Sequence, residues 1–195
     1  MNNTREYIIN QSYSLFLSHS YEAVSISEIS KAIGLTKGAL YHHFTNKEEL
    51  FKAVIDKYLV FEEIHVDESR ITLAEYVEKS IDHAQRIMNS ILTSSQNSAP
   101  LNYLSLFIDA LRHYPAYFVE KGNLISHEIE KIKKVIKNAI QTKEIRDDIN
   151  VSITALNFFS IIYGFAGNLV QSNSKETSLE MLRLQLNEMY RTLKL

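Results

Sequence analysis

Residues 25–50, SISEISKAIGLTKGALYHHFTNKEEL, constrain the fold more than any other part of the chain, because they contain three helix starts and one tight turn. Ser25 and Glu28 form a capping box, in which each side chain bonds the backbone of the other residue, and this predicts a helix start. Gly34 follows the apolar face of that helix, where a left-handed residue is usually needed to end it. Thr36 is a good N-cap for a second short helix. Two short helices joined by a turn of about 3–4 residues with a glycine form a helix-turn-helix, whose second helix enters the major groove of DNA.

The second helix, predicted over residues 37–43, gathers side chains that bind nucleic acid. Hydroxyl, imidazole and ammonium groups donate hydrogen bonds to phosphate oxygens, and small residues at a helix start let the backbone approach base edges. Any one of these side chains alone would be better explained as an ordinary surface residue. Together with the caps and the turn, they predict phosphate contacts from Thr36, Tyr41, His42, His43 and Lys47, and base reading by Lys37 with Gly38 and Ala39. Ser25 and Ile26 complete the predicted DNA-binding set.

Residues 1–55 resemble the DNA-binding domain of the tetracycline-repressor (TetR) family of transcriptional regulators. The matching residues are Thr4-Arg5, Ile8, Leu15-Phe16, Tyr21, Val24-Ser25-Ile26, Ile29, Gly34-Leu35-Thr36-Lys37-Gly38, Leu40-Tyr41, His43-Phe44 and Asn46-Lys47-Glu48-Glu49-Leu50. The chain departs from the family pattern at Gln11-Ser12, where a pair of small residues is usual, and at Ser20, where glycine is usual. Ser20 must then adopt a left-handed conformation or end the first helix differently, which affects that corner and not the domain.

Glycine and proline are scarce, with five and two among 195 residues, so helices can run long and strands have few turn signals. A first helix over residues 4–19 offers an apolar face to the two short helices, and the helix that starts at Lys47 is expected to continue to about Phe61 as a rigid link. We therefore predict an all-α fold with a three-helix helix-turn-helix DNA-binding domain over residues 1–46, a linking helix over residues 47–66, and a helical effector-binding and dimerisation domain over residues 67–195.

Composition disfavours several other classes of protein. The chain has no cysteine, so it has neither a disulfide nor a thiolate metal site or nucleophile. The histidines are scattered, and the adjacent His42 and His43 point about 100° apart on a helix; we predict no enzyme, no metal site and no cofactor. The sequence lacks the layout of a secretory signal and any apolar run of about 18 residues, which predicts a cytoplasmic protein with no membrane partner. The net charge of −2 is weak evidence against DNA binding, whereas residues 36–47 carry two lysines, two histidines and no carboxylate.

Aromatic side chains with a few polar tips suggest an effector pocket in the second domain, because such groups form small-molecule sites where they converge. Ordinary core packing is the alternative for aromatic stripes and for a lone histidine. The candidate lining residues are Tyr76, His83, Ile87, Tyr103, Phe107, Tyr114, Tyr117, Phe118, Phe159 and Tyr163. On a further helix, predicted over residues 125–140, four lysines are expected on a solvated outer face, namely Lys131, Lys133, Lys134 and Lys137, and a second nucleic-acid contact is the alternative.

The last two predicted helices form the candidate dimer surface. Leu179, Leu182, Leu186, Met189 and Leu193 repeat at 3-4-3-4 spacing, which is the a/d seam of about two heptads. Packing on the domain's own core is the alternative, but the apolar residues off this stripe exceed what one buried face needs. The other predicted interface residues are Leu156, Tyr163, Gly164 and Gly167. A homodimer through four-helix packing accounts for both faces, and the family resemblance implies the same arrangement.

These observations predict a transcriptional repressor that binds an inverted-repeat operator as a homodimer, with half-sites about 34–36 Å apart or a wider multiple. A small apolar or amphipathic ligand releases it, which requires different affinities for the two states of the dimer. One alternative is a DNA-binding regulator of the same fold without a small-molecule effector, controlled by a protein partner. Another is an activator, because the sign of regulation depends on the position of the operator.

Overall fold

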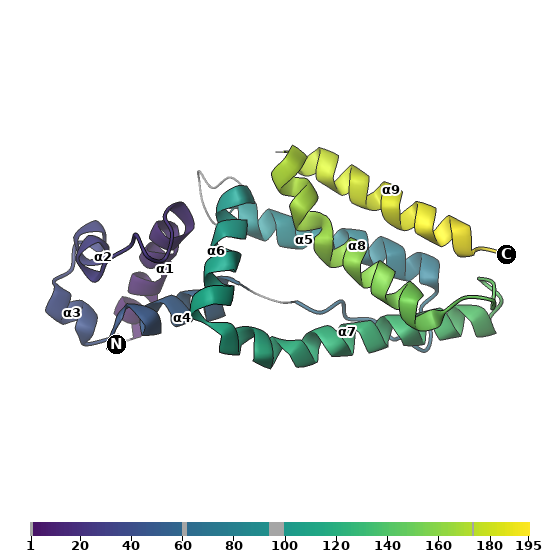
Figure 1. The fold of residues 1–195 in the computed structure, drawn as a ribbon, viewed down its shortest axis with the longest axis horizontal. Helices are drawn as coiled ribbons and strands as arrows, with labels where there is room; N and C mark the ends of the chain where they lie inside the picture. Colours follow the sequence, from purple (N-terminus) through teal and green to yellow (C-terminus); the bar gives the residue numbers. More distant parts are fainter. Residues whose placement is uncertain (1, 60–61, 94–99, 173) are drawn as a thin grey trace. The chain divides into compact units, whose positions relative to one another are not determined.

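The computed structural model describes residues 2–59, 62–93, 100–172 and 174–195, with the side chains of residues 2–3, 90–93, 100, 120 and 165–172 left aside. Within these residues the chain is all-α, as predicted, and the one β contact is an isolated bridge between Ile145 and Lys194. None of the described helices is long and apolar enough to cross a membrane. The helices in Figure 1 are α1 (Asn2–Ser18), α2 (Ile26–Ile33), α3 (Lys37–Tyr41), α4 (Lys47–Tyr58), α5 (Leu73–Thr93), α6 (Pro100–His113), α7 (Pro115–Gln141), α8 (Val151–Ser172) and α9 (Lys175–Leu193).

The helix-turn-helix forms as its caps predict. The Ser25 hydroxyl accepts the Glu28 N–H at 3.2 Å, and the Glu28 carboxylate accepts the Ser25 N–H at 2.7 Å, which completes the capping box of α2. Gly34 ends α2 with a φ of +70°, in the left-handed region that favours glycine. The Thr36 hydroxyl then accepts the Ala39 N–H at 3.1 Å and starts α3.

Helix α4 starts where expected, after the N-cap Asn46, but it is shorter than the predicted linking helix. The helix ends at Tyr58, whereas it was expected to continue to about Phe61 within a linking segment that extended to residue 66. Beyond it, the backbone at Ile64 is not helical, and the Ile64 side chain is buried. The Ile64 carbonyl accepts a hydrogen bond from the Lys131 ammonium at 2.9 Å, so a side chain satisfies this backbone group in place of a helical N–H.

The chain divides into two compact units, and each is described by itself. The N-terminal unit comprises residues 1–61 and 95–121, and the C-terminal unit comprises residues 62–94 and 122–195. This division differs from the predicted one because α6 and the start of α7 belong with the DNA-binding helices. Leu106, Ala110 and Tyr117 are buried in the same core as residues of α1 and α4, and α6 packs against both of these helices.

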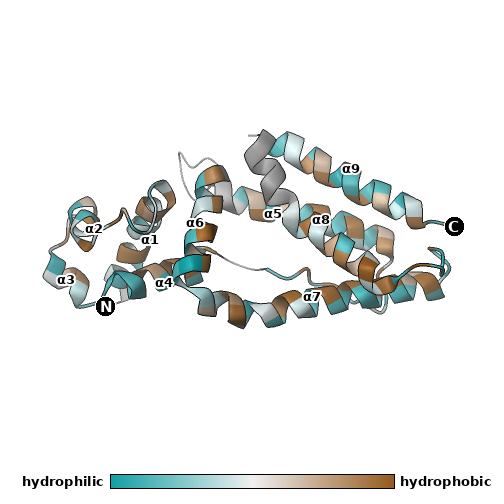
Figure 2. Cartoon of the chain, in the orientation of Figure 1, coloured by the Kyte–Doolittle hydropathy of each residue, from teal (hydrophilic) through white to brown (hydrophobic). Residues whose placement is uncertain are grey.

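Helix α6 ends at His113, and Pro115 is the first residue of α7. Proline suits the first position of a helix, because the N–H that it lacks would have no partner within the helix there. The helix predicted over residues 125–140 therefore begins earlier than expected and runs over Pro115–Gln141. Figure 2 shows hydrophobic and hydrophilic residues in alternating bands along α7, as expected for an amphipathic helix.

In the C-terminal unit, α5, α8 and α9 pack against one another and share a core with α7. Leu182, Leu186 and Leu193 of α9 are buried in that core. These leucines of the heptad stripe therefore pack against α5 and α8 of the same unit, and they are not exposed for contact with a partner chain. This corrects the prediction for these three residues.

Lys131 also departs from its prediction, because it points inward while Lys133, Lys134 and Lys137 keep partial or full exposure. Only 4% of its side chain is exposed, and its ammonium pairs with the fully buried Glu128 carboxylate. The same ammonium lies 3.3 Å from the Glu63 carboxylate. Glu128 lies one turn away on α7, and a buried carboxylate is tolerated where a cation neutralises it.

Candidate nucleic-acid interface and effector site

The recognition surface consists of α3 and the residues that flank it. Its inner side is anchored by Leu40 and Phe44, which are buried in the core of the N-terminal unit together with Ile29 and Ile33 of α2. The predicted contact residues lie on the outer side: Thr36, Lys37, Gly38, Tyr41 and His42 are exposed, and Ala39 and His43 are half-buried. Tyr41 keeps 51% of its surface in solvent, so its ring and hydroxyl are accessible to an outside molecule.

Neither the backbone conformation nor the packing around Gly38 requires a glycine at this position. Its φ is not in the left-handed region, and an added Cβ would meet nothing nearer than the Thr36 hydroxyl at 4.0 Å. Glycine inside a helix is destabilising by roughly 0.5–1 kcal/mol relative to alanine. The fold therefore does not require a glycine here, and the bare backbone is available to an outside molecule.

The donors on α3 and in the turn after it are also accessible to an outside molecule. Lys37 is exposed at the first position of the helix and forms no ion pair with any of the described residues. The rings of His42 and His43 meet edge to face, with their centroids 5.2 Å apart. Ammonium and imidazole N–H groups in this arrangement can donate to phosphate oxygens and base edges.

Lys47, predicted to bind phosphate, is already bound inside the N-terminal unit. Its ammonium donates a hydrogen bond to the Tyr21 carbonyl oxygen at 2.8 Å and lies 4.1 Å from the centroid of the Tyr21 ring. An ammonium has three donors, so two remain for other acceptors. Lys47 therefore joins the start of α4 to the turn before α2.

Two other predicted contact residues also have roles within the fold. The Ser25 hydroxyl is part of the capping box, and the Thr36 hydroxyl caps α3, so their oxygens accept backbone hydrogen bonds. Their hydroxyl protons remain available as donors. Ile26 is half-buried at the start of α2 and packs against the core.

The structure adds Arg5 to the surface, which sequence reasoning did not assign to the site. The guanidinium of Arg5 lies 4.8 Å from the centroid of the Phe44 ring, just beyond the recognition helix, and the residue is exposed. Arginine in this position carries five N–H donors. Its sequence position, far from residues 36–47, gave no signal, because only the packing of α1 brings it to Phe44.

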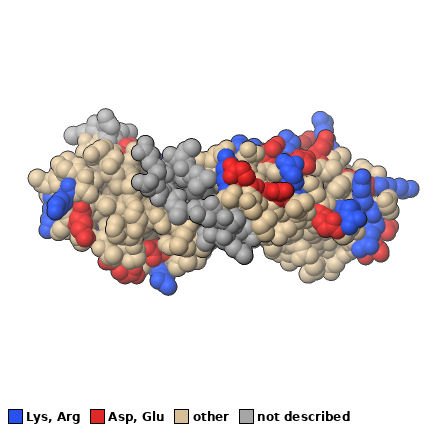
Figure 3. Space-filling view, turned by 90° about the horizontal axis from the view of Figure 1, so that it is seen from above, with Lys and Arg blue, Asp and Glu red and all other residues tan. Residues whose placement is uncertain are grey.

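The carboxylates beside this surface are held by helix caps. Hydrogen bonds from Ser25 lower the pKa of Glu28, and hydrogen bonds from Thr45 lower the pKa of Glu49. Both groups are therefore ionised at neutral pH and bonded to the backbone at helix starts. On the face shown in Figure 3, charged side chains are sparse over the N-terminal unit and dense, with both signs interspersed, over the C-terminal unit.

Half of the predicted effector-pocket residues belong to the N-terminal unit. Tyr103, Phe107, Tyr114, Tyr117 and Phe118 pack into or against the core formed by α1, α4, α6 and the start of α7. The Tyr117 hydroxyl donates to the Leu59 carbonyl oxygen at the end of α4. These five aromatic residues have a packing role in the unit that carries the recognition surface.

The other five predicted pocket residues, Tyr76, His83, Ile87, Phe159 and Tyr163, belong to the C-terminal unit. The Tyr163 hydroxyl donates to the Glu128 carboxylate at 3.2 Å, and the Tyr163 ring stacks on Phe159 with centroids 4.5 Å apart. Burial, and then the charge of Glu128, raise the pKa of Tyr76 well above its ordinary value. Burial and the nearby guanidinium of Arg86 lower the pKa of His83.

The remaining predicted dimer residues divide by exposure. Leu156 and Gly164 are exposed on α8, and a Cβ added to Gly164 would meet nothing within 4 Å. Tyr163 is half-buried, and Leu179 and Met189 are partly buried against the core of their own unit. Gly167 lies on α8, but its surroundings are among those left aside, and Phe61 of the predicted linking helix lies outside the described residues.

Comparison with known proteins agrees with this geometry. Residues 8–54 match the family described as bacterial regulatory proteins, tetR family. The chain is 22% identical over 185 residues to the HTH-type transcriptional repressor AcnR of Corynebacterium glutamicum, which covers 93% of this chain and 90% of AcnR.

Two solved structures have the same fold. One is NalD, the secondary repressor of the MexAB-OprM multidrug efflux pump in Pseudomonas aeruginosa, with a TM-score of 0.64 and 17% identity over 99% of this chain and 97% of NalD. The other is SmeT in a complex with triclosan, with a TM-score of 0.65 and 16% identity over 99% of this chain and 92% of SmeT.

The sequence match spans α1 to α4, which are the helices that carry the recognition surface. The names of these relatives describe transcriptional regulators and not enzymes. The match, the fold and the exposed start of α3 together show a DNA-binding transcriptional regulator in which residues 8–54 form a DNA-binding domain of the tetR family.

Proposed function

We propose that the protein is a repressor that binds an inverted-repeat operator as a homodimer through α3 of each protomer. The observation that carries this proposal is the exposed start of α3, where neither Lys37 nor Gly38 has a role in the fold. Lys37 reads base edges, since a lysine ammonium bonds O6 and N7 of guanine in the major groove. Tyr41, His42 and His43, with Arg5 beside them, bind phosphates.

The proposed dimer surface is an exposed stripe on α8. Ile153, Leu156, Ser160 and Gly164 recur at intervals of three and four residues, so they lie on one face of the helix. Ile153 is 53% exposed and Leu156 is 42% exposed, which makes this stripe apolar at one end. The small residues Ser160 and Gly164 allow another helix to approach closely. Met181 and Leu184 add exposed apolar surface on α9.

The proposed effector site lies beside Tyr76 and Tyr163 in the C-terminal unit. The Tyr76 hydroxyl is buried and forms no hydrogen bond of ordinary geometry with a described residue, since the nearby Ser80 hydroxyl donates to the Tyr76 carbonyl oxygen. Leaving a buried polar group unpaired costs about 1–3 kcal/mol, so a ligand with one polar group would recover this energy. The stacked rings of Phe159 and Tyr163 suit the apolar part of such a ligand. The complex of SmeT with triclosan supports a small apolar or amphipathic compound.

Ligand binding releases the DNA by favouring a dimer in which the two recognition helices no longer match the half-site spacing. The ligand must therefore bind this state more tightly than the DNA-bound state, and DNA must weaken ligand binding by the same factor. The protein acts in the cytoplasm, on double-stranded DNA, and has no membrane partner.

Sedimentation of the protein with a duplex that contains its selected site tests the proposal. We expect two protomers on each duplex, and binding at least about tenfold weaker when one half-site is scrambled, since each mismatched base pair costs about 1–3 kcal/mol. Binding of one protomer to a single half-site with unchanged affinity would contradict the dimeric mechanism.

A further inference from the structure

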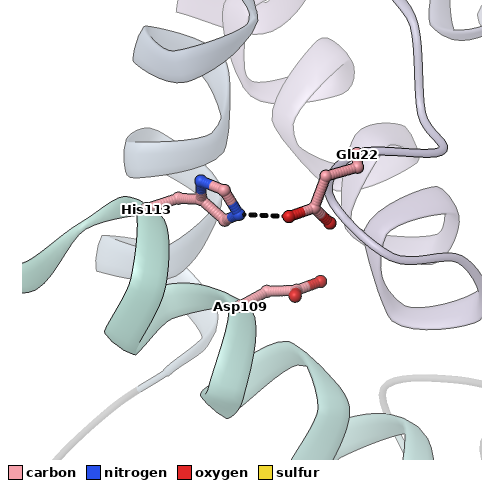
Figure 4. Close-up of side chains that lie close together, drawn as sticks. All are labelled: Glu22, Asp109 and His113. Carbon is pink, nitrogen blue, oxygen red and sulfur yellow. Dashed lines mark hydrogen bonds and ion pairs between the residues drawn. The ribbon is translucent and has the colours of Figure 1, made fainter.

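Three side chains of types that bind metal ions meet within the N-terminal unit. Glu22 lies in the turn between α1 and α2, and Asp109 and His113 lie on α6 (Figure 4). One ligand atom from each residue lies within 4.8 Å of the others, and the Glu22 carboxylate is 2.8 Å from Nε2 of His113. Asp109 and His113 are four residues apart, which places both side chains on one face of α6.

Tyr21 fixes the orientation of both α6 side chains. Its backbone N–H donates to the Asp109 carboxylate at 2.7 Å. Its ring stacks on the His113 ring, with centroids 4.1 Å apart and an interplanar angle of 27°. Metal sites are built in this way, because outer partners hold the ligating groups in a fixed direction.

Asp109 gives the cluster an unbalanced buried charge. It is only 5% exposed, and no ammonium or guanidinium among the described residues forms an ion pair with it. A buried carboxylate is costly unless a cation or several hydrogen bonds compensate it. The His113 imidazole contacts the Glu22 carboxylate, so the Asp109 carboxylate has no cation of its own among the described residues.

We propose that Glu22, Asp109 and His113 bind a divalent first-row transition cation of the Zn²⁺ class, which joins α6 to the turn that precedes α2. One imidazole and two carboxylates are ligands that Zn²⁺ accepts, with a water molecule in the fourth position. Tetrahedral ligands at about 2.1 Å from the metal lie about 3.4 Å apart, so the donor atoms need shifts of no more than about 1.5 Å. This site is separate from the proposed effector site and does not depend on it.

A second group with the same ligand types, Glu63, His127 and Glu128 in the C-terminal unit, serves as an internal control. There the Lys131 ammonium pairs with both carboxylates and supplies the positive charge. His127 is exposed, so its substitution leaves the core intact. We expect this second group not to bind Zn²⁺.

The test is competition between the full-length protein and a chromophoric Zn²⁺ chelator. Wild type should bind one Zn²⁺ per chain, His113→Ala and Asp109→Asn should each weaken binding by more than about tenfold, and His127→Ala should leave it unchanged. Glu22→Gln provides an exposed variant if the α6 variants fail to fold. Cobalt(II) absorption bands that are present in wild type and lost in Glu22→Gln would locate the ligands directly. The assignment would be overturned if wild type bound no Zn²⁺. It would also be overturned if His113→Ala bound Zn²⁺ as tightly as wild type while His127→Ala bound it more weakly.

Discussion

Lys47 and Tyr21 are joined twice, because the Lys47 ammonium bonds the Tyr21 carbonyl oxygen at 2.8 Å and also lies over the Tyr21 ring at 4.1 Å. Tyr21 in turn contacts Asp109 and His113 of α6. The start of α4, the turn before α2 and α6 therefore meet at one tyrosine. This arrangement positions the helix-turn-helix within its own unit.

Lys47→Ala should affect both folding and DNA binding. Loss of the hydrogen bond and the cation–π contact should lower the free energy of unfolding by about 1–2 kcal/mol. Binding should weaken alike for all DNA sequences, with the salt slope reduced by about 1, because a phosphate contact carries no sequence information. Chemical denaturation and anisotropy titrations at several salt concentrations measure the two effects. A changed sequence preference would contradict the assignment of Lys47 to phosphate.

Gly38→Ala should separate folding from DNA binding. An added Cβ meets open space in the chain, so the variant should be as stable as wild type or more stable by roughly 0.5–1 kcal/mol. Binding to the operator should nevertheless weaken, because the methyl group occupies the side of α3 that approaches the bases. Thermal unfolding and operator affinity, measured on the same preparation, test this. Unchanged operator affinity would show that the bare backbone at Gly38 is not used.

Gly164→Leu should block dimerisation without unfolding the protomer. A Cβ added at this exposed position meets nothing within 4 Å, whereas a partner helix on the α8 stripe would collide with a leucine there. Sedimentation equilibrium should show a monomer with an unchanged circular dichroism spectrum. Leu186→Asp is the contrasting variant, since Leu186 is fully buried in its own unit and the change should unfold it. A dimeric Gly164→Leu protein would place the interface elsewhere.

Lys131→Met should destabilise the C-terminal unit by about 3–5 kcal/mol, because it leaves the buried Glu128 carboxylate without a cation. The double variant Lys131→Met with Glu128→Gln should recover much of this loss, since no buried charge then remains. Urea denaturation of the two variants measures the difference. Equal destabilisation in both would show that packing, and not charge, explains the effect of Lys131.

His83 should make stability depend on pH on the acid side. Burial, and then the positive charge of Arg86, lower the pKa of His83, and His65 acts in the same direction. Glu62 favours the charged imidazole, but its effect is smaller than the sum of the others. The neutral form is therefore favoured in the folded state, and its stabilising effect is complete above the unfolded pKa of about 6.5. This stability is lost as pH falls below that value. Between pH 7 and 5, the free energy of unfolding of wild type should fall more steeply than that of His83→Gln, and parallel curves would contradict this.

The local signals in the sequence predicted the helix-turn-helix well because each one depends on neighbouring residues alone. The capping box of Ser25 and Glu28 and the left-handed Gly34 need no tertiary information. The position of α6 could not be predicted in the same way, because its aromatic residues fit a ligand pocket and a helix-packing core equally well.

Heptad spacing was also ambiguous, because it does not say whether an apolar stripe packs within its own chain or against a partner chain. The stripe that includes Leu182 and Leu186 is apolar whether it meets a partner chain or α5 and α8, and only the packing shows that it meets its own unit. Lys131 was misassigned because a lysine pattern does not reveal a buried carboxylate one turn away. The cluster of Glu22, Asp109 and His113 joins residues far apart in the chain, so no spacing rule could find it.

Selection of bound sequences from a random double-stranded DNA library, with purified full-length protein at moderate salt, tests the central claim most directly. We predict recovery of an inverted repeat whose half-sites are separated by about 34–36 Å or a multiple of it. The same selection with Lys37→Ala should recover sites with relaxed preference at one position in each half-site. Recovery of no enriched sequence by folded, dimeric protein, also after unfolding and refolding to remove any bound ligand, would contradict the account.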